Sequence, residues 1–305
     1  MNSGSGVPDQ YKMDWDKKGG TSVLSRLLYQ SMNMLGALFA FLFFANQSIS
    51  PAYAIVGGEP AKPHEFPFLA SFYLQGKWTG GCGGALISPR HVLSCAHCFK
   101  DKKPELMEVG FGKTSRTDDE GVVKRQVQSF AFHPKLDISI IILDDEVPLS
   151  EHVKTIGLPE VGSDYTGQTA TLAGPGALGE DGSLPKELMM KVLLKVGTGQ
   201  KNTTTNTGGQ GCPFKGNYGV CATSMKEEPW GSGCGGDSGS PLFVCSTTDA
   251  CTVLAPIIGP PPYGEQKCDK GDSAGPSVSA LRPWIDEVMQ GSTNVTPRKG
   301  RPMWK

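Results

Sequence analysis

From Phe66 onward the chain alternates short apolar runs with turns rich in glycine, proline, asparagine and aspartate. Short runs spaced in this way are typical of an all-β protein. Within residues 190–196 the positions alternate with period two, which favours a strand although the composition would also allow a helix. The runs are FPFLASFYL, GALISPRHVLS, VVKRQVQSFAF, ISIIILDD, TATLAGPG, MKVLLKV, PLFVCS and TVLAPIIG.

One segment, SALRPWIDEVMQ (279–290), has the periodicity of a helix. Ser279 is available as its N-cap, because a serine hydroxyl accepts a hydrogen bond from a free N–H of the first turn. The following residues, 291–305, have no periodicity and predict a flexible tail. The apolar face of the predicted helix consists of Leu281, Trp284, Ile285 and Val288.

The first 54 residues differ from the rest. Basic residues precede a short apolar run, MLGALFAFLFFA (34–45), which leads through NQSIS to Ala52-Tyr53-Ala54. This order predicts a signal peptide covering residues 1–54, and therefore secretion to an extracellular or periplasmic space. A retained anchor on a surface-bound protein is the alternative, but a membrane span needs about 20 apolar residues. We therefore expect no stable membrane insertion after processing.

Composition narrows the class of protein. The 305 residues are 38% hydrophobic and carry a formal net charge of -1, so no basic excess indicates a nucleic-acid partner. The nine cysteines are an odd number for an exported chain, where most are expected to form disulfides. The only close Cys-His cluster is CAHC (95–98), so we expect no metal site and no cofactor.

Four motifs together resemble the trypsin-like serine proteases, the S1 family with the chymotrypsin fold. They are IVGG (55–58), SCAHC (94–98), DISIIIL (137–143) and GDSGSP (236–241). The resemblance implies two packed six-stranded antiparallel Greek-key β-barrels, about 55–160 and about 161–278, with a C-terminal helix. It assigns residues 55–290 to one protease domain.

The resemblance implies a Ser-His-Asp triad and an acyl-enzyme intermediate. Ser238 is the expected nucleophile and His97 its general base, because a serine hydroxyl is a weak nucleophile unless a neighbouring imidazole takes its proton. Asp137 is expected to orient the imidazole. The backbone N–H groups of Gly236 and Ser238 are the expected oxyanion hole, in a turn that glycines make tight.

The resemblance also gives Ile55 and Asp237 a role as an activation pair. In the family the freed amino group of the isoleucine folds inward and pairs with this aspartate. Here the small-x-small site ends at Ala54, so cleavage of the Ala54–Ile55 bond would serve both secretion and activation. Because a free α-amine has a pKa near 8, raised by pairing, we expect activity to fall in the alkaline range.

The cysteine pairs are also implied by the resemblance: Cys82–Cys98, Cys212–Cys221 and Cys234–Cys268. Cys245 and Cys251 lie close in sequence and would close a hairpin. Cys95 is then left as a free thiol, and a small buried residue is favoured over a reactive one.

For the specificity pocket, the resemblance places Ser232 at the base. Gly233 and Gly275 would leave the pocket open, which predicts a large apolar or aromatic P1 side chain. Asp269 or Asp272 would favour a basic one instead. Phe111 stands at the position of a calcium-binding glutamate in trypsins, so no calcium site is expected. The remaining wall residues are Gly259, Pro260 and Pro261, and prolines cannot donate the backbone hydrogen bonds that substrates use.

The sequence thus predicts a secreted, monomeric serine endopeptidase, with protein or peptide substrates and protein protease inhibitors as partners. The alternative is a catalytically weak or inactive protease-fold binding protein, which the proline wall and the glycine at position 259 keep open.

Overall fold

The structure is a computed structural model. It describes residues 55–179, 182–184, 188–197, 214, 216–225, 231–247, 250–258, 268 and 272–291. Several predictions fall outside these residues: the leader (1–54), the tail after 291, Cys212, Asp269 and the wall formed by Gly259, Pro260 and Pro261.

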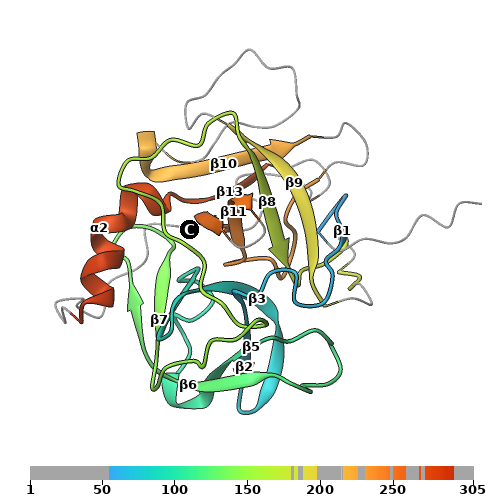
Figure 1. Cartoon of the computed structure of the whole chain (residues 1–305), viewed down its shortest axis with the longest axis vertical. Coiled ribbons are helices and arrows are strands. Elements are labelled where there is room, and N and C mark those ends of the chain that lie inside the picture. Colours follow the sequence, from blue (N-terminus) through green and yellow to red (C-terminus); the bar gives the residue numbers. More distant parts are fainter. Residues whose placement is uncertain are drawn as a thin grey trace, which may run out of the picture. The chain divides into compact units, whose positions relative to one another are not determined.

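The first sheet is a closed barrel of six antiparallel strands, drawn in blue-green to green in Figure 1. Its strand order is β2-β3-β4-β7-β6-β5. A short 3-10 turn, η1 (Pro104–Leu106), precedes β5. The strands are β2 (Leu69–Leu74), β3 (Lys77–Ser88), β4 (His91–Ser94), β5 (Met107–Phe111), β6 (Val123–Phe132) and β7 (Ser139–Leu143).

Aromatic rings fill one end of this barrel. Phe72 and Phe99 are almost completely buried and meet edge to face, with ring centroids 4.7 Å apart. Phe111 is also fully buried in the same cluster. Burial of side chains of this size contributes about 1.5 to 3 kcal/mol each, so the barrel is a rigid base for the loops at its rim.

The second sheet has the strand order β12-β11-β8-β9-β10-β13, and β1 pairs with β9 at its side. Unlike the first sheet, the second sheet is not closed into a barrel by strand pairing within the described residues. One backbone hydrogen bond, from Ile258 N–H to the Ala274 carbonyl (2.9 Å), links its two end strands. The strands are β1 (Glu59–Pro60), β8 (Thr169–Gly174), β9 (Met190–Gly197), β10 (Gly219–Ser224), β11 (Pro241–Thr247), β12 (Ala250–Pro256) and β13 (Ser273–Pro276), with a 3-10 turn η2 (Gly216–Tyr218) before β10.

Strand β9 confirms the period-two interpretation of residues 190–196. Met190, Val192, Leu194 and Val196 are buried, whereas Leu193 and Lys195 face solvent. The alternation exists because one face of the strand packs on the core of the second sheet.

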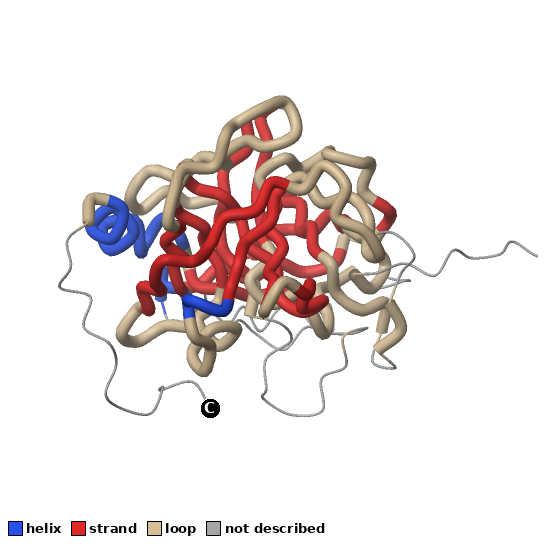
Figure 2. The backbone as a smooth tube through the Cα atoms, turned by 90° about the horizontal axis from the view of Figure 1, so that it is seen from below, coloured by secondary structure: helices blue, strands red, loops and turns tan. Residues whose placement is uncertain are grey.

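The helix α2 (Val278–Met289) agrees with the predicted segment to within one residue. Its N-cap is Ser277, which accepts a hydrogen bond from Ala280 N–H at 3.3 Å. The prediction of Ser279 as the cap was therefore wrong, because Ser279 lies inside the first turn and its hydroxyl donates to the Ser163 carbonyl at 3.0 Å. In Figure 2 this helix lies at one side of the strands.

One apolar cluster joins the two sheets and the helix. It includes Leu93 and Ile140 from the first barrel, Phe243 from the second sheet, and Leu281 and Ile285 from α2. The loops that carry the chemical groups therefore rest on a common core. No helix within the described part of the chain is both long and apolar enough to cross a bilayer.

Candidate active site

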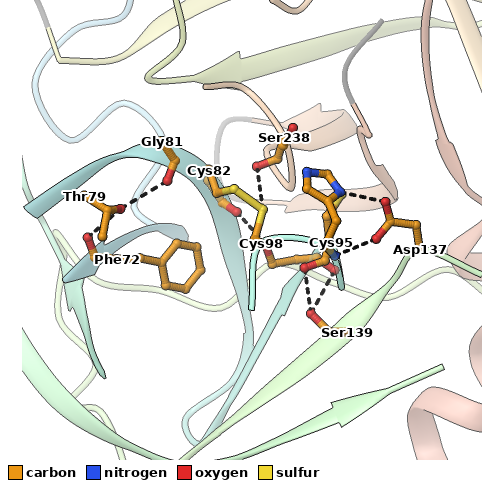
Figure 3. Close-up of a disulfide and its surroundings, with 12 residues drawn as sticks. Phe72, Thr79, Gly81, Cys82, Cys95, Cys98, Asp137, Ser139 and Ser238 are labelled. Carbon is orange, nitrogen blue, oxygen red and sulfur yellow. Dashed lines mark hydrogen bonds and ion pairs between the residues drawn. A yellow bond between two sulfur atoms is a disulfide. The ribbon is translucent and has the colours of Figure 1, made fainter. Parts of the chain in front are cut away.

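His97 and Asp137 meet because two neighbouring strands end at the same level. Strand β4 pairs with β7 so that Ser94 lies opposite Ser139, which brings the turn after β4 next to Asp137, two residues before β7. Asp137 then accepts two hydrogen bonds from one residue: Oδ1 from the His97 backbone N–H (2.8 Å) and Oδ2 from the ring Nδ1 (2.6 Å). Figure 3 shows this contact beside Cys95.

The burial of this pair is unequal. The Asp137 side chain is 8% exposed and the His97 side chain 32%. A carboxylate that accepts from Nδ1–H fixes the ring in the tautomer whose Nε2 carries a lone pair. The imidazole therefore has one nitrogen bound inside the protein and one available as a base.

The turn that carries Ser238 is tied to the first barrel by backbone hydrogen bonds. Cys82 N–H donates to the Gly236 carbonyl (3.0 Å), and Gly83 N–H donates to the Ser238 carbonyl (2.8 Å). The Cys82–Cys98 disulfide joins strand β3, which contains Cys82, to the residue after His97. The Cys98 sulfur lies 3.9 Å from the Ser238 carbonyl oxygen (Figure 3). Segments far apart in sequence are thus fixed at one place.

Glycine is required in this turn. Gly236 and Gly239 have positive φ angles of 92° and 82°. A Cβ on Gly239 would also lie 2.1 Å from the Ser94 hydroxyl oxygen. Side chains at these positions would therefore be strained and would separate the turn from the first barrel.

Asp237 occupies a different environment from Asp137. It is fully buried, and its carboxylate accepts backbone hydrogen bonds from Gly176 N–H (2.8 Å) and Cys234 N–H (2.9 Å). Burial raises the pKa of Asp237 to about 7, while the two N–H donors and the Arg116 charge oppose that rise. Two neutral donors leave a fully buried carboxyl without an adequate counter-charge.

The chain segment that begins at Ile55 lies in the same part of the molecule. Ile55 is fully buried, and Val56 forms a β-bridge with Ser232. Val56 also packs in one cluster with Ala177 and Cys234. The N–H of Cys234, and that of the residue before Ala177, are the two donors to Asp237.

The described residues expected at the base of the specificity pocket pack closely against their neighbours. Ser232 is buried and its hydroxyl donates to the Cys268 carbonyl. A Cβ on Gly233 would lie 2.5 Å from Ile257 Cδ1, and one on Gly275 would lie 2.0 Å from the Pro256 carbonyl oxygen. Glycine at these two positions therefore permits close packing, and the opposite wall of the expected pocket lies outside the described residues.

Ile257 and Ser273 lie against Gly233, which is expected at the specificity pocket, and the sequence did not single them out. Ile257 is fully buried beside Gly233, and the Ser273 hydroxyl accepts a hydrogen bond from Gly233 N–H at 3.0 Å. Neither lies in a motif. Asp272 is described, and burial raises the pKa of its carboxyl.

Three disulfides are formed among the described residues: Cys82–Cys98, Cys234–Cys268 and Cys245–Cys251. The expected partner of Cys221, Cys212, lies outside them. Cys95 is free and fully buried, and its thiol donates to the Ile257 carbonyl at 2.9 Å. Burial, and secondarily the Asp137 charge, raises the pKa of this thiol well above its usual value.

Potential metal ligands in the described part of the chain gather around His97. One group, with Cys82 and Cys98, uses sulfurs that are already joined in a disulfide. The other consists of Cys95, His97 and Asp137. In that group His97 Nδ1 and Asp137 Oδ2 bind each other, so an ion there would have to break this contact. Phe111, which stands at the position of the calcium-binding glutamate of trypsins, is buried in the first barrel.

A closed six-stranded barrel, a second antiparallel sheet and a histidine–aspartate pair beside a Gly-Asp-Ser-Gly turn define a chymotrypsin-like fold. The sequence profile of the family described as Trypsin matches residues 55–285, and the chain belongs to this trypsin family.

Individual relatives agree with the family. Chymotrypsin-C of Bos taurus is 30% identical over 82% of this chain and 96% of its own length. Azurocidin of Homo sapiens is 28% identical over 85% of this chain and 96% of its own. Among solved structures, human heparin binding protein matches with a TM-score of 0.62 and 26% identity, covering 81% of this chain and 99% of that one.

Proposed function

We propose that the chain is a serine endopeptidase that hydrolyses peptide bonds in proteins or peptides. The observation that carries the proposal is the two-point contact between Asp137 and His97, next to a glycine turn that presents Ser238. This combination supplies a nucleophile, a base and a group that orients the base.

In the proposed reaction the Ser238 hydroxyl attacks the substrate carbonyl while His97 Nε2 takes its proton. The oxyanion accepts hydrogen bonds from the backbone N–H groups of Gly236 and Ser238. His97 then gives the proton to the leaving amine, and an acyl group remains on Ser238. Water, activated by the same imidazole, releases the acyl group and restores the hydroxyl. Asp137 stays ionised throughout and stabilises the imidazolium.

Activation, in this proposal, depends on a free Ile55 amino group. The Asp237 carboxyl is fully buried, and a cationic α-amine would supply the counter-charge that its neutral donors do not. A single cleavage after Ala54 would release the protein from its leader into the secretory space and create this amine. We expect the secreted enzyme to be a monomer that protein protease inhibitors regulate.

For specificity, we propose an apolar P1 side chain, with large and aromatic ones included. Ser232 is neutral and already hydrogen-bonded, and Ile257 together with the Cys234–Cys268 disulfide makes the surroundings apolar. Peptide substrates that differ only at P1 test this: phenylalanine and leucine should exceed lysine in kcat/KM, and equal rates with lysine would contradict it.

The test of the main proposal is hydrolysis of fluorogenic peptides by protein that starts at Ile55. Ser238→Ala is the matched control. We expect turnover that disappears in Ser238→Ala, and labelling of Ser238 by an organophosphorus reagent. Turnover that persists in the variant would come from a contaminant and would contradict the proposal.

The alternative, a binding protein without turnover, is favoured by one comparison, the similarity to human heparin binding protein. Heparin is a polyanion, whereas this chain has 29 lysines and arginines against 30 acidic residues. A folded mature protein that binds partners but neither hydrolyses peptides nor reacts with the organophosphorus reagent would establish the alternative.

A further inference from the structure

The loop between β5 and β6 is held in a fixed shape by an internal cation. The Lys113 side chain is 2% exposed, and its ammonium donates to the Asp118 carbonyl (2.7 Å) and the Asp119 carboxylate (2.5 Å). Asp119 is also bound by Lys124 (2.6 Å) and by the Tyr73 hydroxyl (2.6 Å). The residues in the middle of this loop are therefore presented rigidly.

Arg116, in the middle of the loop, reaches from the first barrel to the second sheet. Its guanidinium donates to the Pro175 carbonyl (2.8 Å) and the Leu188 carbonyl (3.3 Å). It also lies over the Trp78 ring, 5.5 Å from the ring centroid. Both hydrogen bonds come from Nη2, and the planar guanidinium can make them while its flat face lies over the indole ring.

The Pro175 carbonyl and the Gly176 N–H belong to the same peptide group. That N–H donates to Asp237 Oδ1 at 2.8 Å. The hydrogen bonds therefore form a series, from guanidinium to peptide carbonyl and from the same peptide's N–H to the buried carboxylate. Successive hydrogen bonds polarise one another, so a cation at the carbonyl strengthens the donor at the other end.

The same short segment supports the turn with the expected nucleophile. Ala177 N–H donates to the Gly235 carbonyl at 2.7 Å. A Cβ on Gly236 would lie 3.1 Å from Gly176 Cα, and one on Gly176 would lie 2.3 Å from Asp237 Cγ. Gly176 therefore packs closely against both Gly236 and Asp237, so a shift of the Pro175–Gly176 peptide would displace the turn.

We propose that Arg116 is a positioning residue for catalysis: it fixes the Pro175–Gly176 peptide that holds Asp237 and the oxyanion turn. The inference rests on the proposed function, because it assigns Arg116 a part in the same reaction. The Arg116 charge also lowers the pKa of Asp237 against the effect of burial, which agrees with an electrostatic link between the two residues.

Three variants of protein starting at Ile55 test the proposal. Arg116→Met keeps an unbranched side chain against Trp78 but removes the charge and the donors, and Arg116→Lys restores the charge. Arg125→Met is the matched control, because Arg125 donates to the Glu146 and Lys124 carbonyls on the first barrel. For each variant kcat and KM are measured, together with inhibition by a peptide boronic acid that mimics the tetrahedral intermediate.

We expect kcat of Arg116→Met to fall about 10- to 100-fold, as for loss of a charged hydrogen bond, with KM changed less than about threefold. Boronate affinity should fall with kcat, because both depend on the oxyanion donors. Arg116→Lys should regain part of the loss. Unchanged kcat in Arg116→Met, a loss confined to KM, or an equal loss in Arg125→Met would overturn the proposal.

A second measurement does not require turnover. In the Ser238→Ala background, amide hydrogen exchange of Gly176 should become at least about tenfold faster with Arg116→Met, in line with loss of local protection, and unchanged with Arg125→Met. Unchanged exchange in Arg116→Met would also overturn the proposal. If the unaltered protein fails to hydrolyse peptides while exchange responds as expected, the proposed function fails and the Arg116 support stands.

Discussion

The region around Asp137 and the region around Asp237 solve the same physical problem differently. Each keeps a carboxyl group away from water. Asp137 lies at the barrel rim with an imidazole already in contact, supplied by the neighbouring turn. Asp237 is fully buried in the turn before β11 and has only backbone donors within hydrogen-bond distance among the described residues.

The two regions differ in whether strand pairing alone brings a charged or polar side chain to the carboxyl group. Strand pairing between β4 and β7 is sufficient to join His97 to Asp137. In the proposed activation, Asp237 has no cationic partner from Ile55 while Ile55 is bonded to Ala54, because a peptide nitrogen carries no charge. In the proposed function, the histidine–aspartate pair needs no cleavage, whereas Asp237 would gain its counter-charge only when Ile55 is freed.

The largest effect is expected from Asp137→Asn in the mature protein. The amide no longer stabilises the tautomer with a basic Nε2, and kcat should fall about 10⁴-fold, as the corresponding change does in this family. Steady-state kinetics on a peptide substrate measure the loss. A decrease of less than about tenfold would mean that Asp137 does not orient His97.

Asp237→Asn should have a smaller but still large effect. It removes the charge that would hold the Ile55 amine, and so loosens the turn that carries Gly236 and Ser238. We expect kcat to fall about 10²- to 10³-fold, the range for loss of an oxyanion donor. Burst titration separates a lower rate from a lower number of active sites. Full activity would show that the turn forms without the ion pair.

The uncleaved chain should lose stability as pH rises from about 4 to about 7. Its folded Asp237 has a pKa raised by burial to about 7, so across this range the folded state binds more protons than the unfolded state. The loss amounts to about 3 to 5 kcal/mol. Urea unfolding of the Ser238→Ala chain with Ala54 retained measures it, and Asp237→Asn in the same background should remove this dependence. The same slope with asparagine would assign it to other groups.

The smallest effect is expected at Cys95. Burial and the Asp137 charge raise the pKa of its thiol, so iodoacetamide at pH 8 should leave it unmodified in the folded protein. Cys95→Ala should keep activity within about threefold, because its hydrogen bond goes to a carbonyl rather than to the His97–Asp137 pair. Rapid alkylation with parallel loss of activity would contradict this.

The sequence predicted the strand β9 from apolar residues that recur with period two, and it predicted the helix from a face of four apolar residues; the short strand β5 (MEVGF) has the same alternation but was not among the predicted runs. It did not predict β10 (GVCATS) or β13 (SAGP), because neither has apolar alternation: β10 forms by pairing with β9 and β13, and β13 by pairing with β10. Turns rich in glycine look alike in sequence whether or not a strand follows them.

The site shows the same limit. His97, Asp137 and Ser238 lie in motifs, and the sequence identified them as candidates. Arg116, Ile257 and Ser273 lie in no motif, because their contacts join segments that are far apart in the sequence.

The central claim is that the site becomes complete only when Ile55 is a free N-terminus. Two preparations of the same chain test it most directly, one beginning at Ile55 and one retaining Ala54, each verified by N-terminal sequencing. The account predicts that kcat on a peptide substrate is at least about 100-fold higher for the protein that begins at Ile55, the range for an oxyanion donor. Equal kcat values for the two preparations would contradict it.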